Sequence, residues 1–89
     1  MPTVKVRMYA TVRESAGKPE AEVDAVDLEG LLRRLAELFG QRFSKLLSGA
    51  GDEGLVILVN GRNVKPGSRK NVRFCEGDEV SIFPPVSGG

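Results

Sequence analysis

The sequence contains no histidine and no tryptophan, and it has only one cysteine among its 89 residues. Without histidine the chain lacks the side chain that most often moves protons near neutral pH, so a histidine general base and a Ser-His-Asp triad are excluded. The single cysteine, Cys75, excludes an internal disulfide, and with no histidine the common zinc ligand sets are excluded too. If the protein takes part in chemistry, we expect a partner to supply most of it, and we expect no metal site.

Long apolar runs and an excess of one charge are also missing. No segment approaches the roughly 20 apolar residues of a membrane span, and residues 1–5 contain no signal-peptide core. Thirteen basic and twelve acidic residues give a net charge of +1, and the strongest basic cluster, Arg69-Lys70 with Arg73, is short and interrupted. We therefore expect a cytoplasmic location, no membrane contact and no direct nucleic-acid binding.

The composition that remains is that of an ordinary globular domain. Hydrophobic residues make up 40% of the chain and charged residues 28%. A chain of this length forms one domain, near the lower end of what a hydrophobic core alone stabilises. The sequence predicts a folded domain over residues 1–83 and an extended tail over residues 84–89.

Hydrophobic periodicity in the first half of the chain predicts two strands and one helix. Residues 3–10 and 20–25 alternate between apolar and polar side chains, as half-buried strands do. A turn at 15–19 would join them as an antiparallel hairpin. Leucines then recur at steps of three and four residues, which predicts an amphipathic helix over about 28–39, with Asp27 as its N-cap.

Shorter elements are predicted in the second half. The apolar cluster within 43–47 indicates one irregular turn under the sheet, and residues 48–54 indicate a flexible loop. The apolar run at 55–59 ends at Asn60-Gly61, a tight-turn signal, and predicts a central strand. Further short strands are expected at Asn63-Val64, around Val72 and Phe74, and over 79–83.

The order of these elements favours one fold class. A hairpin, a helix and several short strands follow one another, with no internal repeat. One helix on one face of a mixed sheet is the economical way to bury their apolar sides. We predict an α+β fold of the ubiquitin-like β-grasp type, with a mixed sheet of about 4–5 strands covered on one face by the helix at about 28–39. By analogy with that fold, the first and last strands lie side by side at the centre.

The C-terminal tail is the strongest candidate for a reactive group. Pro84-Pro85 stiffens the exit from the last strand, because proline fixes φ and has no amide donor. Val86-Ser87 comes next, and then Gly88-Gly89, which has no side chains. Such a segment can thread a narrow channel and present the Gly89 carboxylate to an active site in another protein. A frayed tail without a role is the alternative.

Two aromatic residues predict a partner surface near that tail. Tyr9 and Phe83 both fall on the outward positions of their strands. If the first and last strands are neighbours, the two rings form an apolar patch at the root of the tail, and such patches often bind partners. Two isolated surface aromatics are the alternative. Cys75 has no histidine or other base beside it, which favours a structural role over a transfer thiol.

Both ends of the chain resemble the MoaD family. Residues 9–17, Tyr-Ala-Thr-Val-Arg-Glu-Ser-Ala-Gly, are similar to the family's aromatic-Ala-x-x-Arg-Glu-x-x-Gly signature. Residues 77–89, which end in Phe-Pro-Pro-Val-Ser-Gly-Gly, are similar to the family's ending almost residue for residue. MoaD is the small subunit of molybdopterin synthase and is related to ThiS and to ubiquitin. Residues 61–76 depart most from the family.

The resemblance implies a sulfur carrier that is not catalytic alone. A MoeB-like adenylating enzyme would use ATP to convert the Gly89 carboxylate to an acyl-adenylate, and a persulfide sulfur donor would replace AMP to leave a thiocarboxylate. Inserted into a MoaE-like large subunit, this sulfur would attack a pterin precursor in molybdenum cofactor biosynthesis. Gly88 would keep the tail slender, Pro84-Pro85 would direct it, and Tyr9 and Phe83 would dock partners. No permanently bound cofactor is implied.

The same activated terminus serves other functions in similar proteins. Some are conjugated through the terminal glycine to lysines of other proteins, as ubiquitin is, and others donate sulfur for tRNA thiolation. The ending of this chain favours molybdopterin synthesis, although activation is common to all three functions. A non-covalent interaction module, with no chemistry at Gly89, is the remaining alternative.

Overall fold

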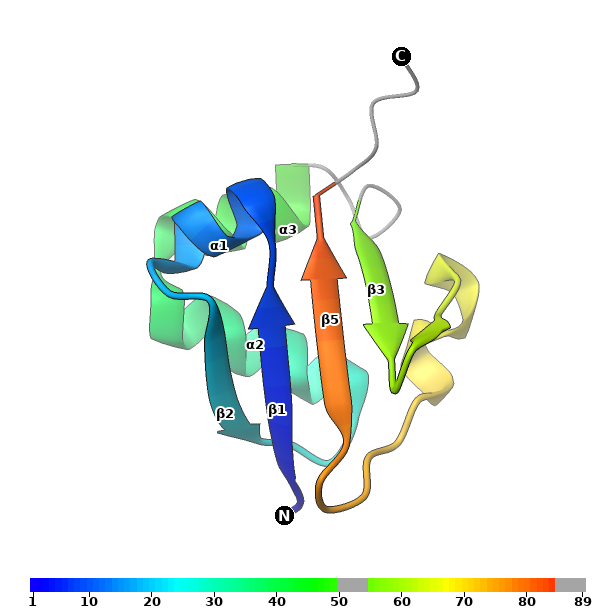
Figure 1. Ribbon diagram of the computed structural model, residues 1–89. Coiled ribbons are helices and arrows are strands. Elements are labelled where there is room, and N and C mark those ends of the chain that lie inside the picture. Colours follow the sequence, from blue (N-terminus) through cyan, green and yellow to red (C-terminus); the bar gives the residue numbers. More distant parts are fainter. Residues whose placement is uncertain (50–54, 85–89) are drawn as a thin grey trace.

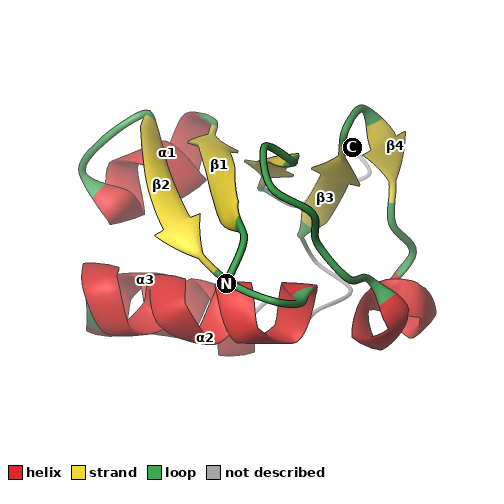
Figure 2. Cartoon of the chain, turned by 90° about the horizontal axis from the view of Figure 1, so that it is seen from below, coloured by secondary structure: helices red, strands yellow, loops and turns green. Residues whose placement is uncertain are grey.

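The computed structural model describes residues 1–49 and 55–84. It shows a mixed five-stranded sheet with helices packed against it (Figure 1). The elements in chain order are β1 (Thr3–Met8), α1 (Ala10–Ala16), β2 (Glu20–Asp24), α2 (Leu28–Phe39), α3 (Gln41–Gly49), β3 (Val56–Val59), β4 (Arg62–Asn63), the 3-10 helix η1 (Pro66–Asn71) and β5 (Glu79–Phe83). The strand order across the sheet is β2-β1-β5-β3-β4. Figure 2 shows α2, α3 and η1 on the same side of the sheet.

The first and last strands occupy the middle of the sheet, as predicted. β5 pairs in parallel with β1 and antiparallel with β3, while β2 and β4 form the two edges in antiparallel pairs. The prediction of an α+β, ubiquitin-like β-grasp fold with a mixed sheet is confirmed, and the described residues form five strands.

Alternating residues of the central strands form the core between the sheet and its helices. Six inward residues on β1, β3 and β5 are essentially inaccessible, with exposed fractions of 0–1%. These residues are Val4, Val6, Met8, Ile57, Val80 and Ile82. From the other layer, α2 contributes Leu28, Leu31 and Leu35, each 0% exposed.

The predicted boundaries of α2 are confirmed at both ends. The carboxylate of Asp27 accepts a hydrogen bond of 2.8 Å from the backbone N–H of Gly30, which satisfies one of the first-turn donors. Gly40 follows the last residue with a φ of 83°, a value that side chains disfavour. The N–H of Gly40 donates to the carbonyl of Ala36, so this carbonyl in the last turn of α2 has a hydrogen-bond partner.

The prediction for residues 10–16 was wrong. The first strand ends at Met8 rather than at residue 10. α1 includes residue 10, expected in the strand, residues 15–16, expected in the turn, and residues 11–14, for which no element was predicted. The chain leaves the sheet at Ala10, whose φ is 52°, and α1 ends at Gly17 with a φ of 82°. The antiparallel pairing of β1 with β2 is correct, because α1 lengthens the connection without changing its direction.

The prediction for residues 41–49 was also wrong. They form the helix α3 instead of an irregular turn followed by a loop that starts at residue 48. Phe43 is 0% exposed and lies against Phe39, with ring centroids 5.5 Å apart. A hydrophobic residue buried this fully makes α3 part of the second layer. The rest of the predicted loop, residues 50–54, lies outside the described residues.

No regular strand forms around Val72 and Phe74. An isolated bridge between Asp27 and Arg73 is recorded there, and η1 precedes it. A proline at the start of η1 favours a helical turn over a ladder strand, because it has no N–H to donate. Nearby boundaries differ by one residue: β3 begins at Val56, and β4 covers Arg62–Asn63 in place of Asn63-Val64.

Candidate functional site

The chain leaves the domain from the end of its central strand. β5 lies between β1 and β3 and ends at Phe83, and the next residue, Pro84, is half-buried. Pro84 is therefore held at the edge of the folded domain, where a stiff residue can set the direction of the tail. The other predicted tail residues, Pro85, Val86, Ser87, Gly88 and Gly89, lie outside the described residues, so their roles stay predictions.

Tyr9 and Phe83 stack against each other at this exit. Their ring centroids are 4.4 Å apart and their planes differ by 4°. Both side chains are half-buried, so each presents one part to the domain and another to solvent. Their expected proximity is confirmed, and the alternative of two isolated aromatics is wrong. Their role in docking a partner stays a prediction.

Backbone hydrogen bonds hold Tyr9 from both sides. Its N–H donates to the carbonyl of Ile82 on β5 at 3.2 Å, and its carbonyl accepts from the N–H of Val12 in α1 at 3.1 Å. The next residue, Ala10, sits in the left-handed region, which costs a residue with a side chain about 1–2 kcal/mol. The surrounding bonds maintain this strained conformation, and they fix the ring of Tyr9 beside the exit.

The apolar surface extends from the stacked rings onto β3. Val56 is directly opposite Phe83 in the antiparallel register, and Leu58 is opposite Ser81, so both lie on the outer face of the sheet. Both are half-buried. We define the outer apolar patch as Tyr9, Phe83, Val56 and Leu58. Sequence reasoning did not assign Val56 and Leu58 to the site, although the unbroken apolar run on both faces of β3 was the available signal.

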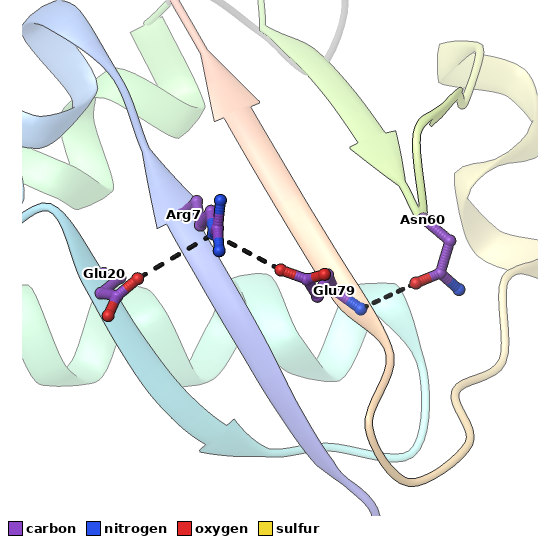
Figure 3. Close-up of polar contacts among 4 residues, drawn as sticks. All are labelled: Arg7, Glu20, Asn60 and Glu79. Carbon is purple, nitrogen blue, oxygen red and sulfur yellow. Dashed lines mark hydrogen bonds and ion pairs between the residues drawn. The ribbon is translucent and has the colours of Figure 1, made fainter.

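Farther from the exit, the same face of the sheet carries charges. Arg7 lies between Glu20 and Glu79, with N–O distances of 3.9 Å and 3.4 Å (Figure 3). These side chains are about half exposed, so each ion pair contributes at most about 1 kcal/mol. The outer face is thus apolar beside the exit and polar beyond it, which is the arrangement of an interface centre and its rim.

Cys75 lies away from the exit. It is exposed in the turn before β5, at the opposite end of that strand from Phe83, and its N–H donates to a carboxylate oxygen of Asp78 at 2.8 Å. The thiol is therefore no part of the candidate site. Within residues 1–49 and 55–84, no three His, Cys, Asp or Glu side chains gather closely enough to hold a metal ion. In the same ranges, no helix is long and apolar enough to cross a membrane.

A model of the ThiS family matches residues 6–89, which include both the stacked aromatics and the glycine pair. The chain belongs to the ThiS family. A relative from Archaeoglobus fulgidus, a "putative sulfur carrier protein", is 33% identical over 97% of this chain and 98% of its own length. The "molybdopterin synthase sulfur carrier subunit" of Drosophila yakuba is 33% identical over 97% of this chain and 90% of its own length. "Small archaeal modifier protein 3" of Haloferax volcanii is 32% identical over 97% and 98%.

Solved structures place this ThiS-family protein in the same group. Small archaeal modifier protein 1 from Methanosarcina acetivorans has a TM-score of 0.80 at 30% identity, with coverage of 100% of this chain and 98% of that one. A putative molybdopterin converting factor subunit 1 from Pyrococcus furiosus has a TM-score of 0.78 at 29% identity, covering 97% and 100%. A chain of the protein–protein complex of subunits 1 and 2 of molybdopterin-converting factor from Helicobacter pylori has a TM-score of 0.67 at 25% identity, covering 98% of this chain and 99% of that one. The protein is thus a member of a ubiquitin-like family of sulfur carriers and modifiers.

Proposed function

We propose that this ThiS-family protein is the sulfur-carrying small subunit of a molybdopterin synthase, with Gly89 as the residue that carries the sulfur. The observation that carries the proposal is the family match, which continues through the glycine pair to Gly89. The Drosophila relative, a molybdopterin synthase sulfur carrier subunit over nearly the same span, favours this pathway. The exit of the chain beside the outer apolar patch supports delivery of the tail to a partner.

The proposed chemistry needs a partner, because a carboxylate at neutral pH is a poor acylating group. A MoeB-like enzyme uses ATP to form an acyl-adenylate at Gly89 and releases pyrophosphate. A persulfide donor then attacks the acyl carbon, AMP leaves, and reduction of the resulting acyl disulfide by a thiol gives the thiocarboxylate. Gly88 and Gly89 leave room for close approach in both active sites. ATP belongs to the activating enzyme, and the carrier itself holds no permanent cofactor.

The large subunit is the second proposed partner. In the H. pylori complex, a chain similar to this one is bound to subunit 2 of the molybdopterin-converting factor. We place the corresponding contact of this protein on the outer apolar patch, because its aromatic centre and charged surroundings match the anatomy of interfaces. Pro84 then directs residues 85–89 into the active site of that MoaE-like subunit, which supplies the basic catalytic residues.

Phe83→Asp is expected to weaken binding of the MoaE-like subunit by about 2 kcal/mol or more, the loss typical of an aromatic hot spot. The unfolding free energy is expected to fall much less, because Phe83 is half-buried and its stack with Tyr9 contributes about 0.5–1.5 kcal/mol. Titration calorimetry and thermal unfolding measure the two effects, and Phe83→Leu is the matched control that keeps an apolar side chain. If stability collapses while binding by the remaining folded protein is normal, Phe83 is a core residue and the docking role is wrong.

Conjugation to proteins is a second candidate function, favoured by the presence of modifier proteins among the similar chains. H. volcanii small archaeal modifier protein 3 matches along the whole chain, and the M. acetivorans modifier has a TM-score of 0.80. Both functions use an acyl-adenylate at Gly89. They differ in the nucleophile that attacks it: a sulfur donor gives a thiocarboxylate, whereas a lysine amine gives an isopeptide bond.

Intact-mass measurement of the protein purified from its native cells separates these functions. The carrier function predicts a species in which one oxygen is replaced by sulfur, and iodoacetamide is expected to alkylate it even in a Cys75→Ser variant. The same cells are digested with trypsin and searched for remnants of the tail on lysines. Abundant remnants without any thiocarboxylate would favour the modifier and contradict the proposal.

A further inference from the structure

A second candidate surface lies at the end of β3 that is farther from Phe83 and the exit of the chain. Val59 is three residues, about 10 Å, along the strand from Val56, and it faces the opposite side of the sheet. A groove of about 510 Å³ opens there, between the β3–β4 hairpin and Val72, the residue that follows η1. Its lining residues are Val59, Asn60, Arg62, Val64 and Val72.

The hairpin forms a rigid wall of this groove. Asn60 and Gly61 have φ values of 51° and 84°, so the turn has the left-handed geometry of a tight two-residue hairpin. The side-chain amide of Asn60 donates to Asp78 at 3.1 Å, and its side-chain oxygen accepts from the N–H of Glu79 at 2.9 Å (Figure 3). The hairpin tip is thereby tied to the start of β5.

Val72 lies opposite the hairpin and directly follows η1, which is held in place by a buried arginine. Arg69 is 5% exposed, and its guanidinium donates to the carbonyl of Leu55 just before β3. The N–H of Val72 donates back to the carbonyl of Arg69 at 3.3 Å, which closes the end of η1. With both walls fixed, the groove is formed before any ligand arrives, so binding costs little ordering of this protein.

The floor of the groove is apolar and its surroundings are basic. Val59, Val64 and Val72 are half-buried: they pack against the core and also line the groove. Residues 60–75 contain five basic residues and no acidic residue. Four of these basic side chains are exposed, namely Arg62, Lys65, Lys70 and Arg73.

These four exposed cations have no carboxylate partner in the part of the chain that the structure describes. The ion pairs recorded there join Arg7 to Glu20 and to Glu79, on the outer face of the sheet. The carboxylate of Asp78, near the hairpin, is already engaged by Asn60 and by the N–H of Cys75. The single charge of Asp78 offsets one of these cations at most, so a net positive charge is left beside the groove to attract an anionic ligand.

We propose that this groove binds an extended acidic segment of a partner protein, in which apolar side chains alternate with aspartate or glutamate. The apolar side chains would lie on the three valines, and the carboxylates would face the four cations. β4 is the edge strand of the sheet, so its outer side is open to an extended chain. Nucleic acid fits less well, because residues 60–73 contain no aromatic side chain on which a base could stack.

The groove and the outer apolar patch can be occupied at the same time. They lie on opposite faces of the sheet, because Val56 and Leu58 face outward and Val59 faces the helices. A protein held in the groove therefore stays bound while the tail enters a different active site. This inference does not depend on the chemistry proposed for Gly89.

The test uses the full chain and a fluorescein-labelled synthetic peptide of alternating glutamate and leucine. Fluorescence anisotropy is expected to show binding that weakens as salt is raised. The double variant Arg62→Glu, Lys65→Glu is expected to weaken it about tenfold or more, since two attractive contacts become repulsive. Arg33→Glu, Arg34→Glu changes the net charge equally on exposed positions of α2 and is expected to change affinity by less than about twofold.

Changes in backbone amide chemical shifts in NMR spectra locate the bound peptide. The largest changes are expected for the amides of residues 59–73. The proposal is overturned by absence of binding at millimolar peptide, by equal weakening in both double variants, or by shifts confined to other regions. It is also overturned if a single-stranded oligonucleotide binds the same residues more tightly. If sedimentation equilibrium shows a dimer, and the double variant Arg62→Glu, Lys65→Glu abolishes it, the groove is occupied by a second copy of this chain instead. If the first double variant unfolds, Lys65→Glu, Lys70→Glu replaces it with the same expected loss.

Discussion

Adding one residue after Gly89, or deleting Gly89, is expected to abolish adenylation by the cognate activating enzyme. One extended residue moves the carboxylate by about 3.3 Å, and a misplacement of about 1 Å already costs on the order of 100-fold in rate. We therefore expect kcat/KM to fall by at least about 100-fold in ATP–pyrophosphate exchange. The fold is expected to persist, because the five strands and the hydrophobic core that the structure describes all precede residue 85.

An extra residue placed before Met1 is the matched control for that experiment. It lengthens the chain equally, and Met1 is 78% exposed, so neither stability nor adenylation is expected to change. Normal adenylation of the C-terminally extended protein would show that the Gly89 carboxylate is not the reacting group. A non-covalent interaction module would then be the better description of this family member.

Phe43→Ala is expected to lower the free energy of unfolding by about 3–5 kcal/mol, the cost of emptying an aromatic site in a core. Phe43 is 0% exposed and contacts Phe39 across the junction of α2 and α3. A domain of this size has a total stability of only about 4–13 kcal/mol, from about 0.05–0.15 kcal/mol per residue. The variant therefore loses a large share of its stability and is expected to be substantially unfolded near physiological temperature.

Urea denaturation of the two proteins measures this loss. Leu38→Ala is the control, because Leu38 lies on the same layer but is 59% exposed, and its replacement is expected to change stability by less than about 0.5 kcal/mol. Equal midpoints for Phe43→Ala and the parent protein would mean that α3 does not pack into the core.

The sequence predicted the elements whose periodicity is long and regular. Alternation at 3–10, 20–25 and 79–83, the apolar run at 55–59 and one leucine stripe were enough for the order of elements along the chain, and Asp27 marked the start of α2. The central place of the first and last strands was expected by analogy with the β-grasp fold. α1 was missed because only Val12 of its seven residues is fully buried, so it carries no repeating apolar stripe. α3 was missed because its apolar residues span little more than one turn.

The candidate site was also predicted only where the sequence pattern is regular. The outward positions of Tyr9 and Phe83 follow from strand alternation, and their stacking follows from the pairing of the first and last strands. Val56 and Leu58 joined them only when the register of β3 against β5 was known. The strained φ of Ala10 has no signal in composition or periodicity, because it depends on the bonds that fix Tyr9.

The central position of β5 has a mechanical consequence. A partner that pulls on the tail applies its force along β5, which is hydrogen-bonded to β1 on one side and to β3 on the other. Force along a strand loads these bonds together, in shear, instead of opening them one at a time as peeling an edge strand would. The tail is thus anchored where the sheet best resists extraction, so the protein can be gripped by its terminus, and released again, without losing its fold.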